Sequence, residues 1–130
     1  MTLPELKPGP ELDSFLAEHI LHWHRDGSWW CDAAGKRQAH AAAFAPSNDD
    51  DAAYLIQYSL ERNGELWSKS LIYIPYRAVY QQDIAGDYHV AFIGTTSEYP
   101  DFSGQGKTKE LALCAAALRF LEIKEGNNAN

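Results

Sequence analysis

The sequence predicts an α+β fold in which three helices pack with an antiparallel sheet of about four strands, as an α-β-β-α-β-β-α sandwich. Apolar residues recur at helical spacing behind capping residues in three segments, residues 10–23, 49–63 and 108–124. Aromatic and β-branched residues, separated by turns that contain glycine, fill the two stretches between these segments. This alternation of patterns is typical of a single α+β domain.

Length and charge limit the kind of protein. The 130 residues include 45% hydrophobic side chains, and we expect one domain over residues 10–124 between short tails at 1–9 and 125–130. The longest apolar run, Leu111 to Leu118, is too short to span a membrane, so we expect no membrane partner and a cytoplasmic location. The net charge of -7 opposes binding to a phosphate backbone, and we expect no nucleic-acid partner.

The first half of the chain predicts a helix followed by a hairpin. Pro10 can occupy the first turn of this helix. Its apolar stripe consists of Leu12, Phe15, Leu16, Ile20 and Trp23. We expect strands at Trp29–Asp32 and Gln38–Phe44, with a turn around Gly35.

The second helix is predicted from the segment FAPSNDDDAAYLIQYSL, residues 44–60. Ser47 and Asn48 are both suitable N-cap residues, and the carboxylates of residues 49–51 suit the positive end of a helix dipole. Residues 63–64, Asn-Gly, supply a left-handed stop. The acidic run lacks the alternating oxygen donors, turn glycine and distal glutamate of a calcium loop, so we interpret it as a helix start.

The second half predicts a longer hairpin. Residues 66–80, interrupted by Pro75, and residues 88–93 are expected strands joined by a turn at 83–87. Both faces of these strands carry apolar side chains, so we expect the sheet to be covered on both faces, by helices or by another subunit. A loop at residues 97–106 should then lead to the last helix.

The last helix is expected from Thr108 to about Lys124, with Gly126 as its stop. Residues 111–118 are apolar around nearly the whole circumference, which favours a buried central helix; a contact between subunits is the alternative. Cys114 lies in this run and is expected to be a reduced core residue.

Three elements span about residues 11–122: the opening LDSFLAEHILHW helix with its Trp-Trp hairpin, the FAPSNDDDAAYLIQYSL segment, and the closing KTKELALCAAALRFLE helix. Together they resemble the phage ABA sandwich domain family, small phage and prophage proteins with the Bacillus phage protein-like fold. The resemblance implies an α+β sandwich and a phage origin, and it brings no catalytic residues. The chain differs from the family in a longer, more tyrosine-rich central hairpin and in the loop at residues 97–106.

A glycine-rich stretch, GQGKT at residues 104–108, precedes the last helix. A phosphate-binding P-loop needs a glycine at the position of Asp101, so the sequence excludes that motif. Free N–H groups at a helix start beside a lysine can still bind a phosphate or carboxylate. The predicted ligand-binding residues here are Gly104, Gly106, Lys107 and Thr108.

Aromatic residues are more numerous than a small core requires. Tyrosine and tryptophan bury a large area while they keep a polar group available, which suits recognition surfaces. We predict that several of them pack on the apolar part of a ligand whose anionic group lies at the start of the last helix. These residues are Trp67, Tyr73, Tyr76 and Tyr80.

The remaining polar group consists of His19, His22, His24 and Asp26, with Cys31 nearby. Since no second ligand pair at fixed spacing completes a tetrahedral site, we expect no metal and interpret these as solvated side chains near a helix C-terminus. No nucleophile lies in a recognisable turn, so we predict no catalytic residue and no cofactor.

These observations predict a non-enzymatic phage accessory protein that acts by binding. In the first hypothesis it is a counter-defence protein that sequesters a host nucleotide-type immune signal, a small anionic ligand, or blocks a host defence protein. In the second it is a structural or protein-interaction module that acts through homo-oligomerisation, and in the third a small metal-dependent enzyme. A pocket with Arg or Lys favours the first, and a flat apolar patch favours the second. His, Asp and Cys side chains within ligand distance favour the third.

Overall fold

The computed structural model describes residues 2–64 and 74–128, and this part of the chain forms three helices and six strands. In chain order they are α1 (Pro10–His19), β1 (His24–Asp26), β2 (Trp29–Cys31), β3 (Arg37–His40), α2 (Asp50–Glu61), β4 (Tyr76–Gln82), β5 (Tyr88–Gly94), β6 (Phe102–Gly106) and α3 (Lys109–Asn128). The predicted α+β class and the three predicted helices are confirmed.

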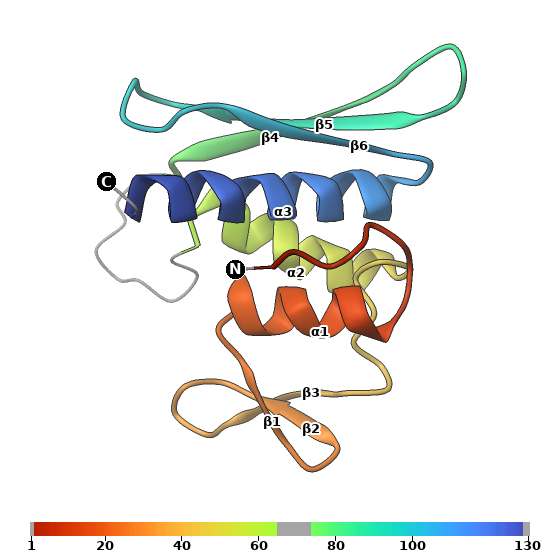
Figure 1. Cartoon of the computed structure of the whole chain (residues 1–130), viewed down its shortest axis with the longest axis vertical. Helices are drawn as coiled ribbons and strands as arrows, with labels where there is room; N and C mark the ends of the chain where they lie inside the picture. The colour runs from red at the N-terminus through yellow and green to blue at the C-terminus, as the bar shows by residue number, and fades with distance from the viewer. Residues whose placement is uncertain (1, 65–73, 129–130) are drawn as a thin grey trace.

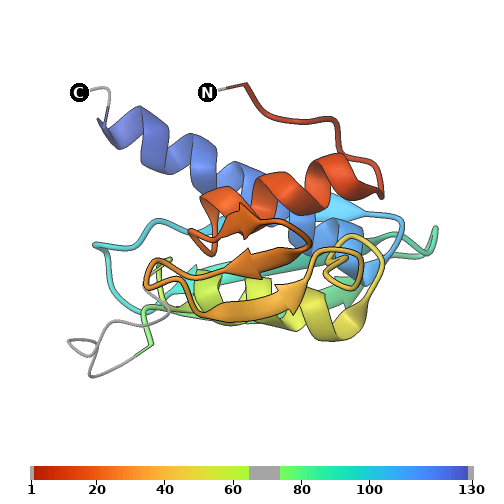
Figure 2. The same cartoon turned by 90° about the horizontal axis from the view of Figure 1, so that it is seen from below.

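The helices lie between two small sheets (Figure 1). Antiparallel strands form one sheet in the order β4-β5-β6 and the other in the order β1-β2-β3. α3 and α2 pack on one face of the β4–β6 sheet, and α1 follows on the far side of this helix layer. Figure 2 shows the β1–β3 sheet from below, on the side of the helices away from the β4–β6 sheet.

The prediction of one sheet of about four strands is wrong, because the described strands form two separate sheets of three strands. β1 was not predicted, because its three residues show no alternation of polar and apolar side chains. All three are exposed, and the strand pairs with β2 across a left-handed turn at Gly27 (φ 61°). β6 was expected to be part of a loop because its sequence, FSGQG, has low β propensity. It nevertheless pairs with β5 over its full length.

The β4–β6 sheet carries helices on one face. In β5, Val90 and Phe92 point toward α3 and are fully buried, whereas Ile93 on the opposite face is exposed. No described element covers that opposite face, so helices cover one face in this part of the chain, and the alternative cover, another subunit, stays a prediction. The predicted turn between β4 and β5 is confirmed, with Asp83 and Asp87 joined by backbone hydrogen bonding.

α3 packs unusually close to β6, because two glycines of the strand face it. A Cβ atom added at Gly104 would overlap backbone atoms of Ala112 and Ala116, and one added at Gly106 would lie 2.7 Å from the backbone N of Ala112. The helix contributes small residues at the same contact. The glycines before the last helix therefore have a packing function in the fold.

The helix boundaries follow local hydrogen bonds. Asp49 caps α2, since its side chain accepts a hydrogen bond from the Ala52 N–H at 3.1 Å; neither Ser47 nor Asn48, the two predicted caps, has this role. Ser47 is instead buried, where its N–H donates to Asp13 at 2.8 Å. The predicted left-handed stop of α2 at residues 63–64 is confirmed.

Two helix ends differ from the prediction. α1 stops at His19, because the chain turns through a left-handed conformation at His22 (φ 58°); Trp23 therefore lies outside the helix, although it is buried. α3 does not stop at Gly126 but continues to Asn128. The predicted strand over residues 38–44 is also shorter and ends at His40.

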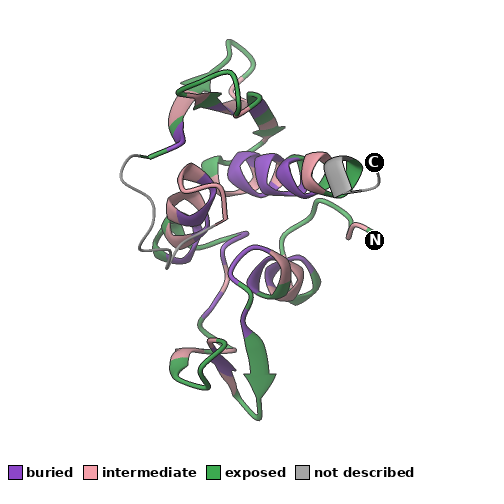
Figure 3. Ribbon diagram, turned by 90° about the vertical axis from the view of Figure 1, so that its left-hand side faces the viewer, coloured by how far each residue is buried: buried purple, intermediate pink, exposed green. Residues whose placement is uncertain are grey.

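The core fills the space between the sheets, where the helices turn their buried sides toward one another (Figure 3). α3 supplies much of it, and its residues 112–114 and 116–118 are all buried, as predicted for a central helix. Under the β4–β6 sheet, the Phe92 and Phe102 rings stack with their centroids 4.8 Å apart. Cys31 and Cys114 are both buried free thiols.

Candidate ligand pocket

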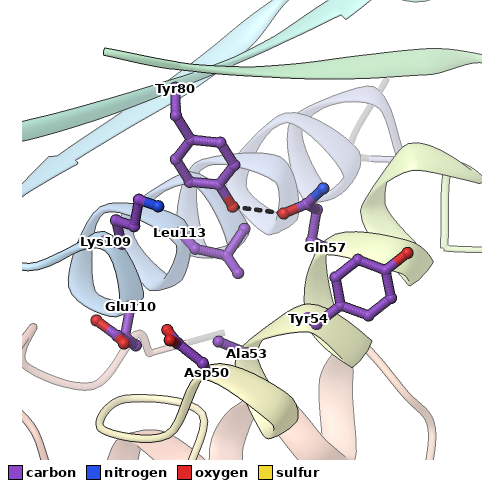
Figure 4. Close-up of a pocket in the computed structure, with 8 residues that line it drawn as sticks. All are labelled: Asp50, Ala53, Tyr54, Gln57, Tyr80, Lys109, Glu110 and Leu113. Atoms are coloured by element: carbon purple, nitrogen blue, oxygen red, sulfur yellow. Dashed lines mark hydrogen bonds between the residues drawn. The ribbon is translucent and has the colours of Figure 1, made fainter. Parts of the chain in front are cut away.

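One of the predicted aromatic residues, Tyr80, lines a pocket between β4, α2 and α3 (Figure 4). The pocket has a volume of about 210 Å³. Its lining residues are Asp50, Ala53, Tyr54, Gln57, Tyr80, Lys109, Glu110 and Leu113. We call it the Tyr80 pocket.

The other predicted site residues lie elsewhere. Tyr76 is buried, its hydroxyl donates to the Pro100 carbonyl at 3.0 Å, and its ring packs on Tyr99 and Phe102, so it belongs to the core. Trp67 and Tyr73 lie outside the described residues. Of these three residues the structure places only Tyr76, and it places it in the core and not at the Tyr80 pocket.

The glycine-rich stretch is only partly a loop. Gly104 and Gly106 belong to β6 and face α3, which leaves Lys107 and Thr108 as the link to the helix. Thr108 caps α3, because its hydroxyl accepts a hydrogen bond from the Leu111 N–H at 3.1 Å. Lys107 is exposed and lies two residues before Lys109 of the Tyr80 pocket. The predicted residues 107–108 thus directly precede the pocket residue Lys109 in the chain but do not line the pocket, and the glycines position the helix start.

Tyr80 is held in place from two sides. Its hydroxyl donates a hydrogen bond of 2.6 Å to the amide oxygen of Gln57 on α2. The ammonium group of Lys109, at the start of α3, lies 5.8 Å from the centre of the Tyr80 ring, within range of a cation–π contact. The ring thereby joins the sheet to the middle of α2, through Gln57, and to the first turn of α3, through Lys109.

Burial raises the pKa of the Tyr80 hydroxyl to about 12, and the nearby carboxylates of Glu61, Asp50 and Glu110 add to the shift. The phenol therefore stays neutral near pH 7 and keeps its proton as a hydrogen-bond donor. A neutral ring beside an ammonium group suits binding better than proton transfer.

Two carboxyl groups meet at the floor of the pocket. Asp50 begins α2 and Glu110 lies in the first turn of α3, so the helix layer brings two helix starts together. A hydrogen bond with the Asp50 side chain raises the pKa of Glu110, and burial adds to the increase. An amino group placed between the two carboxylates would relieve their repulsion without a shared proton.

Sequence reasoning missed Asp50, Gln57, Lys109 and Glu110 as site residues. Asp50 is predicted to lie at a helix start, and the structure confirms this. No pattern in the sequence indicates that the start of another helix lies beside it. The useful signal is that both helices begin with acidic residues and that β4 carries a tyrosine on its inward face. Only the tertiary packing turns these three features into one pocket.

The histidine group does not converge. The His19 ring packs on Phe15 with ring centres 4.2 Å apart, whereas His22 and His24 are exposed. Within residues 2–64 and 74–128, no three His, Cys, Asp or Glu side chains are arranged to hold a metal ion. Burial also raises the pKa of Cys114 to about 12, so this thiol stays protonated.

Treatment with a chelator should leave the melting temperature of the protein unchanged. The reason is that the histidines and cysteines of the described chain do not form a coordination set whose loss would unfold it. Differential scanning fluorimetry with and without EDTA checks this. A fall in melting temperature that added zinc reverses would contradict it.

A crystal structure of a phage protein from Bacillus cereus ATCC 14579 has a similar fold. The two chains superpose with a TM-score of 0.58 and 13% sequence identity, over 94% of this chain and 92% of the other. At this identity the likeness shows the fold alone. The sequence matches no family model and no curated protein. Among the described residues, none of the helices has the length and apolar composition required to cross a membrane.

Proposed function

We propose that this chain is a phage accessory protein of the phage ABA sandwich type, that it acts by binding in the host cytoplasm, and that it catalyses no reaction. The observation that carries the proposal is the Tyr80 pocket, in which a neutral tyrosine ring, a lysine and hydrogen-bonding side chains meet at a helix start. The fold shared with a phage protein supports the phage origin.

The ligand class that suits the pocket is a nucleotide-type molecule. A volume of about 210 Å³ lies below the roughly 300–1,000 Å³ of pockets that enclose whole drug-sized ligands, so the pocket accommodates one planar group of a larger molecule. A base can stack on Tyr80. Its exocyclic amino group can donate to Asp50 and Glu110, as carboxylates accept from amino groups of bases in DNA recognition.

The phosphate of such a ligand must lie away from these two carboxylates. Lys107 and Lys109 stand at the start of α3, where backbone N–H groups also favour an anion. The net charge of -7 repels anions at long range, so this local pair of lysines is necessary for binding. The proposal thus gives the base and the phosphate separate partners, and sequestration of a host immune signal of nucleotide type is the function that follows.

Replacing Lys107 with alanine should weaken nucleotide binding by about 1 to 3 kcal/mol, the range for a hydrogen bond to a charged group. Because the side chain is exposed, the melting temperature should barely change. Isothermal titration calorimetry against linear and cyclic nucleotides measures the affinity. The matched control is Lys124→Ala, at the other end of the same helix, which should bind like the unaltered protein.

Equal nucleotide affinity in the Lys107→Ala and Lys124→Ala variants would contradict the proposed contact between the phosphate and Lys107. The proposed contact between the base and Asp50 is tested separately, with the Asp50→Asn variant. If no nucleotide in the series binds the unaltered protein, the nucleotide proposal itself fails. A structure with ligand bound far from Tyr80 would have the same consequence.

A protein-interaction module that acts through oligomerisation is the second candidate function. The observation that favours it is the face of the β4–β6 sheet that no described element covers, where the apolar side chains of Val79, Ala91 and Ile93 lie among polar ones. In this case a host protein or a second copy of the chain would be the partner.

A further inference from the structure

The floor of the Tyr80 pocket consists of hydrogen-bond acceptors. The carboxyl groups of Asp50 and Glu110 lie side by side there (Figure 4). Within the described residues neither carboxyl group forms an ion pair, and the ammonium group of Lys109 lies 5.8 Å from the centre of the Tyr80 ring instead. An ionised carboxylate accepts hydrogen bonds and donates none. The two carboxylates can therefore receive hydrogen bonds from a ligand.

The neutral polar groups of the pocket are already engaged. The Tyr80 hydroxyl donates to the amide oxygen of Gln57 at 2.6 Å, and the amide nitrogen of Gln57 donates to Glu61 at 3.4 Å. Both ends of this amide are thus occupied. At the floor, the Thr108 hydroxyl donates to Glu110, but a carboxylate has about four acceptor sites and keeps others open. A base that reaches the floor therefore meets acceptors.

Bases differ in the group that they present to such a floor. Adenine and cytosine carry an exocyclic amino group with two N–H donors, whereas hypoxanthine and uracil carry a carbonyl oxygen at the same position. An amino group can give one hydrogen to each of the two carboxylates. A carbonyl oxygen would face two acceptors and would leave both carboxylates desolvated and unpaired, which is unfavourable.

We infer that the pair Asp50–Glu110 selects nucleotides whose base carries an amino group, adenine or cytosine, and rejects those with a carbonyl group in its place. This inference rests on the proposed binding of a nucleotide and specifies which nucleotides bind. Tyr80 can stack on either kind of base, so stacking contributes affinity and the floor contributes selectivity. Sites that hydrogen-bond a ligand N–H discriminate well, because a ligand without it leaves their polar groups unpaired.

Isothermal titration calorimetry of AMP against IMP, and of CMP against UMP, measures the selectivity. The cyclic monophosphates of the same four nucleosides complete the series. Within each pair the amino group of one base is replaced by a carbonyl group in the other. Because Asp50 is exposed and water can reach it, we expect the lower part of the range for base discrimination, a preference of about tenfold for the amino base.

Glu110→Gln should remove most of this preference, and Asp50→Asn should do the same. A side-chain amide presents a donor as well as an acceptor, so it can bind either kind of base. Affinity for AMP should fall while affinity for IMP rises, and a general loss of structure does not produce opposite changes. The matched control is Asp51→Asn, which removes an equal charge from the same turn of α2 but does not line the pocket. This variant should keep the preference.

Equal affinity for both members of each pair in the unaltered protein would overturn this inference and leave nucleotide binding intact. A preference that persists in both the Glu110→Gln and the Asp50→Asn variants would also overturn it, since another part of the protein would then recognise the base. If no nucleotide of the series binds, the proposed function fails and this inference fails with it. Circular dichroism checks that the variants are folded.

Discussion

An alanine at Gly104 should destabilise the fold by about 3 kcal/mol, the upper end of the usual range for overpacking. The added Cβ would overlap backbone atoms of Ala112 and Ala116 in α3. Backbone atoms cannot rotate out of the way as a flexible side chain can. The overlap can therefore be removed only if the whole of α3 moves away from β6. Chemical denaturation measures the change in the free energy of unfolding.

The matched control is Ser103→Ala, one residue earlier on the same strand. Ser103 points away from the helices and is exposed, so this change should alter the free energy of unfolding by less than about 0.5 kcal/mol. If Gly104→Ala also costs less than about 1 kcal/mol, close packing of β6 on α3 does not limit stability.

Leu118→Ala should cost about 2 to 5 kcal/mol, because it removes buried methyl groups and leaves a cavity in the central helix. Leu118 is 8% exposed, so the site can relax in part and the lower half of that range is expected. Thermal and urea denaturation both report the loss. A cost below about 1 kcal/mol would show that α3 is less central than its burial indicates.

The neighbouring Arg119→Ala is the control for this substitution. Arg119 is exposed and pairs with Glu122 at 3.6 Å, a surface ion pair of little value to stability. Both substitutions have the same helix context, so the difference between them isolates the contribution of the buried side chain.

The three helices could be predicted from the sequence because each depends on local signals. Capping residues, apolar spacing and the left-handed stop at residues 63–64 act within a few residues of the helix they define. β6 could not be predicted in this way. Its glycines have poor strand propensity. They are needed because α3 approaches the strand closely, and that contact involves a different element of the chain.

The candidate pocket could be predicted only in part, because only some of its residues belong to local sequence patterns. Tyr80 could be proposed because a tyrosine on a strand is a plausible recognition residue, and Lys107 because it precedes a helix. The pairing of Asp50 with Glu110 depends on how α2 and α3 pack, which no spacing along the chain reveals. Tyr76 shows the opposite case, since the same residue type on the same strand is buried in the core.

The order of elements along the chain also has a consequence for how the protein folds. Each sheet is built from one continuous segment, residues 24–40 for β1–β3 and residues 76–106 for β4–β6, and α3 follows directly after the second segment. The pairings within each segment join residues close in sequence, so little loop entropy opposes them, and such topologies fold fast. Residues 76–128 can therefore assemble as one cooperative unit, onto which the N-terminal half docks.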